Sequence, residues 1–322
     1  MRHTKLFAAL LTSAAISIPA FAWAGPDCGN PPVKTAEAVY TIQTPQQALA
    51  PQVETSEPQP ALQVVEQASE PAMIETTPDV IKTAEVVAPQ GNAAVANYES
   101  VLQRRISRGE GGLNLFDYAG AKADGDGKAI KAYTDYLAAQ NPDSFPEADQ
   151  IAYWANLYNA LTVNLILDNY PVKSIRKIKA GAFSLGPWKR DEVTVNGEVL
   201  SLDDIEHKIL RKRYANPAMV HYMVNCASIG CPNLPSKLWV GETLDADREA
   251  AARAFINSPR GVAIKGNKLK VSSIYNWFEK DFGGSKSAAL DHFREFAGPE
   301  LKAALDAGAK IDGYGYDWDL NE

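Results

Sequence analysis

Apolar and polar positions follow two clear periods along the C-terminal two thirds of the chain. Apolar side chains surround nearly the whole circumference of a helix over 147–169, which predicts a long buried helix. Shorter helices are predicted over 128–139, 201–214 and 245–257, with one or two more over 287–307. Strand–turn–strand patterns predict hairpins over 192–200, with an Asn-Gly turn, and over 261–271, with a Gly-Asn turn.

A short apolar run over 220–224 predicts a buried central strand between the two hairpins. Gly230, Pro232 and Pro235 then break the period and predict a tight polar turn. Strands mixed with helices, without regular βαβ units, predict an α+β fold of helices, antiparallel hairpins and a central strand.

The first 95 residues have a different composition. Residues 1–24 combine a basic start, an apolar stretch and a small-residue motif ending at Ala24, as a secretory signal peptide does. Residues 25–95 are rich in Pro, Gln, Thr and Glu and poor in aromatics, which predicts a disordered tether. A single folded domain is expected over 96–322. We therefore expect a soluble protein that is periplasmic or secreted after cleavage near Ala24.

Charge and cysteine content narrow the function classes. The formal charge is −7, and removal of Arg2 and Lys5 with the signal peptide makes it −9. Such an acidic balance argues against nucleic acid and anionic membrane surfaces as partners. No segment after the signal peptide predicts a transmembrane helix. All three cysteines remain after cleavage, so one disulfide would leave a third cysteine unpaired. The role of Cys28 is left open.

Cys226 and Cys231 lie in the polar turn, and His221 leads into it. In an oxidising compartment the two thiols are expected to close the turn as a disulfide. The alternative is that one of them is a nucleophile, which requires a nearby base. On an ideal strand His221 and Cys226 point to opposite faces, so Cys231 is at least as good a candidate. Backbone amides of 228–231 are candidates for an oxyanion pocket.

Further polar residues are candidates for the same site. Glu206 is a candidate for orienting His221 or His207, and its structural alternative is an ion pair with Arg211. Asp281 is a candidate third member of a triad, although a structural pair or cap is favoured for it. Asparagine is unfavourable inside a buried helix, so the helical asparagines either tie neighbouring loops or line a cleft. The candidate substrate-binding residues are Asn156, Asn159, Asn225, Ser228 and His207.

No metal or cofactor is predicted. Asp124-Gly125-Asp126-Gly127-Lys128 has the wrong spacing for a calcium loop, because a lysine stands at a ligand position. The histidines and cysteines lack the close spacing of a zinc site. His292 lies on a predicted amphipathic helix and is expected at the surface.

Four segments, 152–160, 202–211, 221–232 and 273–282, resemble the family known as domain of unknown function 547. Their order and spacing fit that family over roughly residues 98–285. A weaker similarity is to papain-like and transglutaminase-like folds, although the long helix does not begin with a cysteine nucleophile.

Two functions follow from these patterns. One is a thiol- or histidine-dependent hydrolase or acyl transferase acting on peptide-like amides, with His221, Cys231, Cys226 and Glu206 as its catalytic candidates. The other is a non-catalytic binding or scaffold domain, in which a Cys226–Cys231 disulfide staples the turn and the acidic tether binds a protein partner.

Overall fold

A computed structural model describes residues 90–181, 184 and 186–322. The predicted signal peptide lies outside the described residues, as does the predicted tether up to residue 89. Helix α1 (Gln90–Arg105) begins within the range predicted as tether. None of the helices in the described ranges combines the length and apolar character needed to cross a bilayer.

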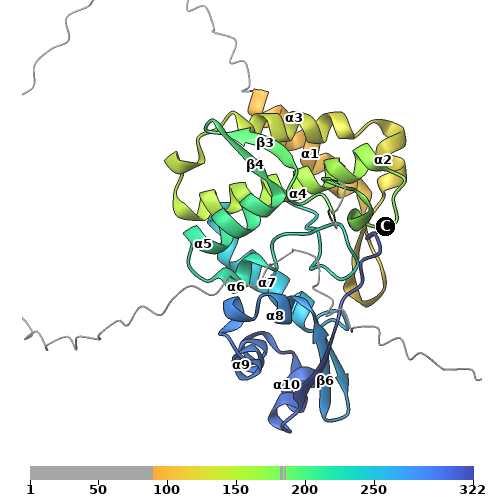
Figure 1. The fold of residues 1–322 in the computed structure, drawn as a ribbon, viewed down its shortest axis with the longest axis vertical. Helices are drawn as coiled ribbons and strands as arrows, with labels where there is room; N and C mark the ends of the chain where they lie inside the picture. Colours follow the sequence, from red (N-terminus) through yellow and green to blue (C-terminus); the bar gives the residue numbers. More distant parts are fainter. Residues whose placement is uncertain (1–89, 182–183, 185) are drawn as a thin grey trace, which may run out of the picture. The chain divides into compact units, whose positions relative to one another are not determined.

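The fold is α+β: Figure 1 shows a body made mostly of helices, and the described strands form two two-stranded sheets and one three-stranded sheet. The further helices are α2 (Tyr118–Asp124), α3 (Gly127–Ala138), α4 (Glu147–Asn169), α5 (Arg211–Arg213), α6 (Pro217–Val220), α7 (Leu244–Ile256), α8 (Ile274–Trp277), α9 (Lys286–Phe296) and α10 (Pro299–Asp306). The strands are β1 (Ile106–Arg108), β2 (Asn114–Phe116), β3 (Asp191–Val195), β4 (Glu198–Ser201), β5 (Val262–Lys265), β6 (Lys268–Ser272) and β7 (Lys310–Gly315).

Helix α4 is the centre of the apolar core, as its all-round apolar pattern predicts. Its residues from Ile151 to Val163 are all buried. Helix α3 packs between α1 and α4, so these three helices form one side of the core. The predicted bounds 147–169 match the helix exactly.

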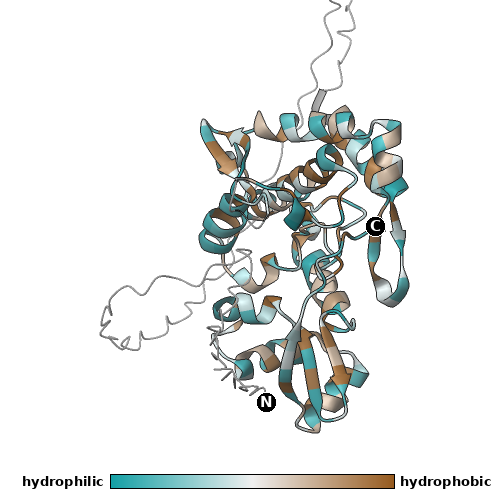
Figure 2. Ribbon diagram, turned by 45° about the vertical axis from the view of Figure 1, so that its right-hand side comes forward, coloured by the Kyte–Doolittle hydropathy of each residue, from teal (hydrophilic) through white to brown (hydrophobic). Residues whose placement is uncertain are grey.

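Both predicted hairpins are present. Strands β3 and β4 pair antiparallel through a turn in which Asn196 and Gly197 have φ of 51° and 78°, the left-handed conformation that a tight hairpin turn requires. Strands β5 and β6 pair antiparallel, and β7 joins β6 in parallel. Polar and apolar residues alternate along this three-stranded sheet in Figure 2, which fits one covered face and one exposed face.

The predicted central strand over 220–224 is not formed. Residues Pro217–Val220 make the short helix α6, and 221–223 continue as turns. The run is still buried, with Tyr222 and Met223 each 1% exposed. Its apolar character was therefore predicted correctly, but four or five apolar residues do not distinguish a strand from a buried helical turn.

The predicted helix over 201–214 contains a π-helical segment, Asp204–Leu210. It starts with a capping box: the Asp204 N–H donates to Ser201 Oγ at 3.2 Å, and the Ser201 N–H donates to Asp204 Oδ2 at 2.9 Å. At its end the Arg211 N–H bonds to the carbonyl of Glu206, five residues earlier. The wider turn therefore brings these two residues onto one side.

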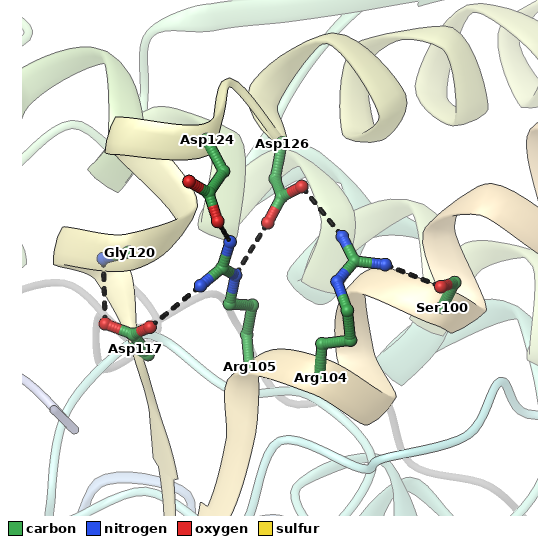
Figure 3. A network of polar contacts seen from close by, with 7 residues as sticks. All are labelled: Ser100, Arg104, Arg105, Asp117, Gly120, Asp124 and Asp126. Atoms are coloured by element: carbon green, nitrogen blue, oxygen red, sulfur yellow. Dashed lines mark hydrogen bonds and ion pairs between the residues drawn. The ribbon is translucent and has the colours of Figure 1, made fainter.

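An arginine network fixes the end of α1 to the α2–α3 connection (Figure 3). Arg105 donates to Asp126 Oδ2 at 2.7 Å and to Asp117 Oδ2 at 3.0 Å, and it also pairs with Asp124. Arg104 donates to Asp126 Oδ1 at 2.9 Å. The carboxylates of the loop considered for calcium are thus bound by guanidinium groups.

Candidate functional site

Residues 225–232 form a loop that helix α4 holds by one amide side chain. Asn159 donates from Nδ2 to the carbonyl of Met223 at 2.9 Å, and its Oδ1 accepts the Asn225 N–H at 2.8 Å. Asn225 then braces the loop from within: its Nδ2 donates to the carbonyl of Pro232 at 2.7 Å, and its Oδ1 accepts the Ala227 N–H at 2.8 Å. Both amides therefore tie the loop together.

The C-terminal tail closes the other side of this loop. The Ile229 and Gly230 N–H groups donate to the carbonyls of Asp319 and Asp317 at 2.9 and 2.8 Å, and the Cys231 N–H donates to the carbonyl of Ser228 at 3.0 Å. Of the four amides considered for an oxyanion pocket, 228–231, those of 229–231 already donate to carbonyls within the protein.

The two thiols of the loop lie side by side. Cys226 Sγ and Cys231 Sγ are 2.7 Å apart, beyond the ~2.05 Å of a disulfide bond. Both cysteines are buried, and the predicted disulfide is not formed in this structure. Cys231 Sγ also accepts the Cys226 N–H at 3.1 Å.

Tyr316 joins the thiols to the C-terminal tail. Its hydroxyl lies 3.0 Å from Cys231 Sγ, 3.2 Å from Cys226 Sγ and 2.9 Å from Ser228 Oγ. Burial raises the pKa of Cys231 well above its ordinary value, and the neighbouring Cys226 raises it further. The hydrogen bonds from Tyr316 and the Cys226 N–H act in the opposite direction but are outweighed. Cys231 is therefore a thiol, not a thiolate, in the resting site at neutral pH.

His221 and Asp281 form a buried pair next to the thiols. His221 is 3% exposed, and its Nε2 lies 2.7 Å from Asp281 Oδ2. Since an ionised carboxylate only accepts hydrogen bonds, Nε2 carries the proton and Nδ1 is the basic nitrogen of the neutral ring. The ring stacks on Phe278 with centroids 4.1 Å apart. Its orientation is thus fixed from two directions.

Burial and hydrogen bonding have opposite effects on the pKa values of His221 and Asp281. Burial lowers the pKa of His221, although the hydrogen bond to Asp281 raises it. Burial raises the pKa of Asp281, but the bonds from His221 and Arg211 hold it at about 2. The Arg211 Nε donates to Asp281 Oδ2 at 2.6 Å. Asp281 is therefore ionised at neutral pH and shared between two donors.

Glu206 and His207 lie beside this pair. Glu206 is 5% exposed, and burial raises its pKa against the attraction of His221 and Arg211 and a hydrogen bond with Tyr158. His207 Nδ1 lies 3.0 Å from the Arg211 guanidinium and 3.8 Å from Glu206. The carboxylate bonded to the His221 ring is Asp281, whereas Glu206 acts on His221 through its charge.

One cavity brings the main candidates together. It has a volume of about 30 Å³, enough for one or two water molecules. Its walls include Glu206, His221, Cys226, Cys231, Tyr158, Trp277 and Tyr316. The structure thus places all four predicted catalytic residues at one cavity.

The predicted substrate-binding residues are placed differently. Asn156, Asn159, Asn225, Ser228 and His207 are not among the cavity walls. Asn156 donates to the carbonyl of Trp239 at 2.8 Å and accepts the Trp239 N–H at 3.0 Å, so it ties a loop as Asn159 does. Ser228 contacts Cys226 Sγ at 3.3 Å in addition to Tyr316. The three asparagines therefore hold loops in place and do not line the cavity.

Two residues of the cavity region lie far along the chain from the predicted site. Asp281 was a triad candidate with a structural pair favoured, and it does pair with His221 and Arg211, whereas Tyr316 was not among the candidates. Neither is near His221 or Cys231 along the chain, and the one local signal was the one-turn spacing of Trp277 and Asp281. His292 was wrongly expected at the surface: it is half-buried, with Nε2 2.8 Å from the Tyr222 hydroxyl, and burial lowers its pKa to about 4.

Within the described ranges no group of three or more His, Cys, Asp or Glu residues is arranged to hold a metal ion.

Residues 142–256 match the model of a family described as "Protein of unknown function, DUF547". The matched range contains α4, the π-helical segment and the Cys226–Cys231 loop, and it ends before Asp281 and Tyr316. No curated protein and no solved structure matches the chain. The resemblance expected from the sequence is confirmed over these residues.

Proposed function

We propose that this protein is an exported thiol-dependent hydrolase or acyl transferase that acts on peptide-like amides. The supporting observation is the shared cavity, whose walls include two thiols and an imidazole whose Nε2 is bonded to an ionised aspartate. This set supplies a nucleophile, a base and a group that orients the base. The general pattern recurs on unrelated folds, so it supports the chemistry independently of fold.

In this proposal Cys231 is the nucleophile. The Cys226 N–H donates to its sulfur, and a hydrogen bond to sulfur stabilises the thiolate that forms during attack. His221 Nδ1 takes the thiol proton as sulfur attacks the carbonyl carbon of the amide. The C–N bond then breaks, and the imidazolium returns the proton to the leaving amine.

Either water or an acceptor amine then attacks the thioester and regenerates the thiol. Because the amides of 229–231 are engaged, the Tyr316 hydroxyl, 3.0 Å from Cys231 Sγ, is the donor assigned to the developing oxyanion. Asp281 keeps Nδ1 directed away from its own side and stabilises the imidazolium. Glu206 adds negative charge that favours the same protonated state.

Substitution of the two central residues tests this function. His221→Gln and Cys231→Ser are each assayed against a library of peptide amides, together with Lys302→Gln, which changes an exposed charge on α10. Loss of turnover by at least about 100-fold in both site variants, with normal turnover in the control, supports the proposal. Unchanged turnover in both site variants contradicts it.

A second function is favoured by the size of the cavity and by the resting state of the thiol. About 30 Å³ does not admit a peptide, and the pKa of Cys231 is raised. A non-catalytic binding or scaffold domain needs neither a wider cavity nor a thiolate. Thiol titration before and after reductant separates the two: a Cys226–Cys231 disulfide formed in full in the preparation that binds its partner favours the second function.

Export is part of both proposals. Its support is the signal-like sequence of residues 1–24. N-terminal sequencing of the protein from the periplasmic or secreted fraction is expected to begin near Gly25, and retention of Met1 in a cytoplasmic fraction contradicts export.

A further inference from the structure

A second and larger hollow lies directly beside the thiol cavity. It has a volume of about 480 Å³, which is within the range of small-ligand sites. Its walls include Arg260, Lys265, Lys270, Tyr316 and Trp318. We call this hollow the basic groove.

Two lysines of the basic groove lie on one face of a hairpin. Lys270 is paired with Ala263 across β5 and β6, and Lys265 lies two residues beyond Ala263, on the same face because side chains alternate along a strand. Both lysines are exposed, and among the described residues neither has a carboxylate partner. Lys268, by contrast, pairs with Asp312 at 3.1 Å.

Gly315 leaves room for the side chain of Lys270. A Cβ at Gly315 would lie 2.7 Å from Lys270 Cε and 3.2 Å from its Nζ, so the lysine side chain passes over β7 where no side chain stands in its way. The ammonium group therefore lies over the parallel pair β6–β7.

Arg260 contributes a third positive charge. Its guanidinium donates to the carbonyl of Ile229 at 3.0 Å and to that of Cys231, and it reaches Asn233 Oδ1 at 2.9 Å. All of these acceptors are neutral, so the charge is not cancelled by them. The carboxylate that also lines the groove, Asp317, is exposed and accepts the Asp319 N–H at 2.9 Å. Three positively charged side chains and one negatively charged side chain therefore line the basic groove.

The basic groove continues to the thiols through Tyr316. Its ring is a wall of both hollows, and its hydroxyl lies 3.0 Å from Cys231 Sγ. Gly230, the residue before Cys231, also lines the groove. Trp318 packs against Tyr316 with ring centroids 4.5 Å apart and adds an apolar surface. A ligand in the groove is thus one aromatic ring away from the nucleophile.

We propose that the basic groove binds an acidic peptide, and that its carboxylates select the substrate of the thiol site. That the bound peptide is a substrate rests on the proposed function, whereas the binding of an acidic peptide to the basic groove does not. Lys265 and Lys270 would bind the carboxylates of the peptide, because an ammonium group binds a carboxylate more strongly than it binds a neutral amide. The apolar parts of the peptide would lie against Trp318.

Binding is measured with two labelled probes on the full chain. One probe is a capped hexapeptide of alternating Glu and Ala, and the other has Gln in place of Glu. The Glu probe is expected to bind about tenfold more tightly than the Gln probe and to weaken as salt is raised. Lys265→Gln with Lys270→Gln is expected to remove that preference.

The matched control is Lys128→Gln with Lys212→Gln, which removes the same charge from two exposed lysines of α3 and α5 outside the groove. It is expected to bind the Glu probe within about twofold of wild type. Equal binding of the two probes, no binding of either, or an equal loss in the control pair would each overturn the inference.

The same measurement on Cys231→Ser separates the two proposals. Retained preference for the Glu probe in that variant supports the groove whatever the outcome for turnover. Thiol-dependent turnover with no preference for acidic peptides would overturn the groove and leave the reaction standing.

Discussion

Asp281 is the residue on which the geometry of the buried pair depends most. Its carboxylate accepts from both His221 and Arg211, and its side chain is only 11% exposed. Asp281→Asn keeps the shape of the side chain but removes the charge. The change leaves the Arg211 guanidinium, 19% exposed, without its carboxylate.

The size of the effect follows from the pKa of Asp281. A value of about 2, against an ordinary value of 3.8, corresponds to about 2 kcal/mol of stability at neutral pH. Breaking a buried pair costs about 3–5 kcal/mol when the remaining charge is not compensated. We therefore expect Asp281→Asn to lower the free energy of unfolding by about 2–4 kcal/mol.

Urea unfolding at pH 7 measures this loss. The control is Asp306→Asn, which breaks an exposed pair with Lys302 and is expected to cost less than about 1 kcal/mol. Because the folded pKa of Asp281 is depressed, its contribution is present above pH 4 and is lost as pH falls toward 2. The difference between wild type and Asp281→Asn should shrink over that window. A loss at pH 7 no larger than that of the control would refute the reasoning.

Three further substitutions test other parts of the structure. Asn159→Ala should lower the free energy of unfolding in urea by about 2–4 kcal/mol, because it leaves the Met223 carbonyl and the Asn225 N–H unpaired. The control Asn164→Ala on the same helix should cost under about 1 kcal/mol, and similar losses in the two variants would contradict the role of Asn159 in holding the loop. His292→Phe should abolish the part of the acid destabilisation between pH 6.5 and about 4, because in that window the histidine binds a proton in the unfolded protein but not in the folded one. An unchanged slope of stability against pH would contradict the lowered pKa of His292. Ala227→Gly should raise stability by up to about 1 kcal/mol, because Ala227 has φ of 57°, and a clear loss would argue against strain there.

The sequence predicted the elements whose pattern is local. The long helix α4 has apolar residues on all sides, and Asn196-Gly197 favours a tight hairpin turn, so both were predicted with nearly the right bounds. The 220–224 run was misassigned because its length and composition suit a strand and a buried turn equally. Nothing in the sequence indicates the π-helical segment that brings Arg211 toward Glu206.

The site was predicted where neighbours in sequence are also neighbours in space. Cys226, Cys231 and His221 lie within eleven residues, and their meeting at one cavity followed from a loop that doubles back. The partner of His221 lies 60 residues away, and Tyr316 lies 85 residues beyond Cys231. Contacts between residues so far apart in the sequence depend on how the last sheet and the C-terminal tail pack, and the local pattern of apolar and polar residues does not predict that packing.

The rate of alkylation of Cys231 by iodoacetamide, followed by mass spectrometry across pH, tests most directly whether His221 activates this sulfur. If it does, the wild-type rate should exceed that of His221→Gln by at least about tenfold near pH 7, and the two should converge at high pH, where the thiol ionises without help. Rates that coincide at every pH would contradict the base assigned to His221.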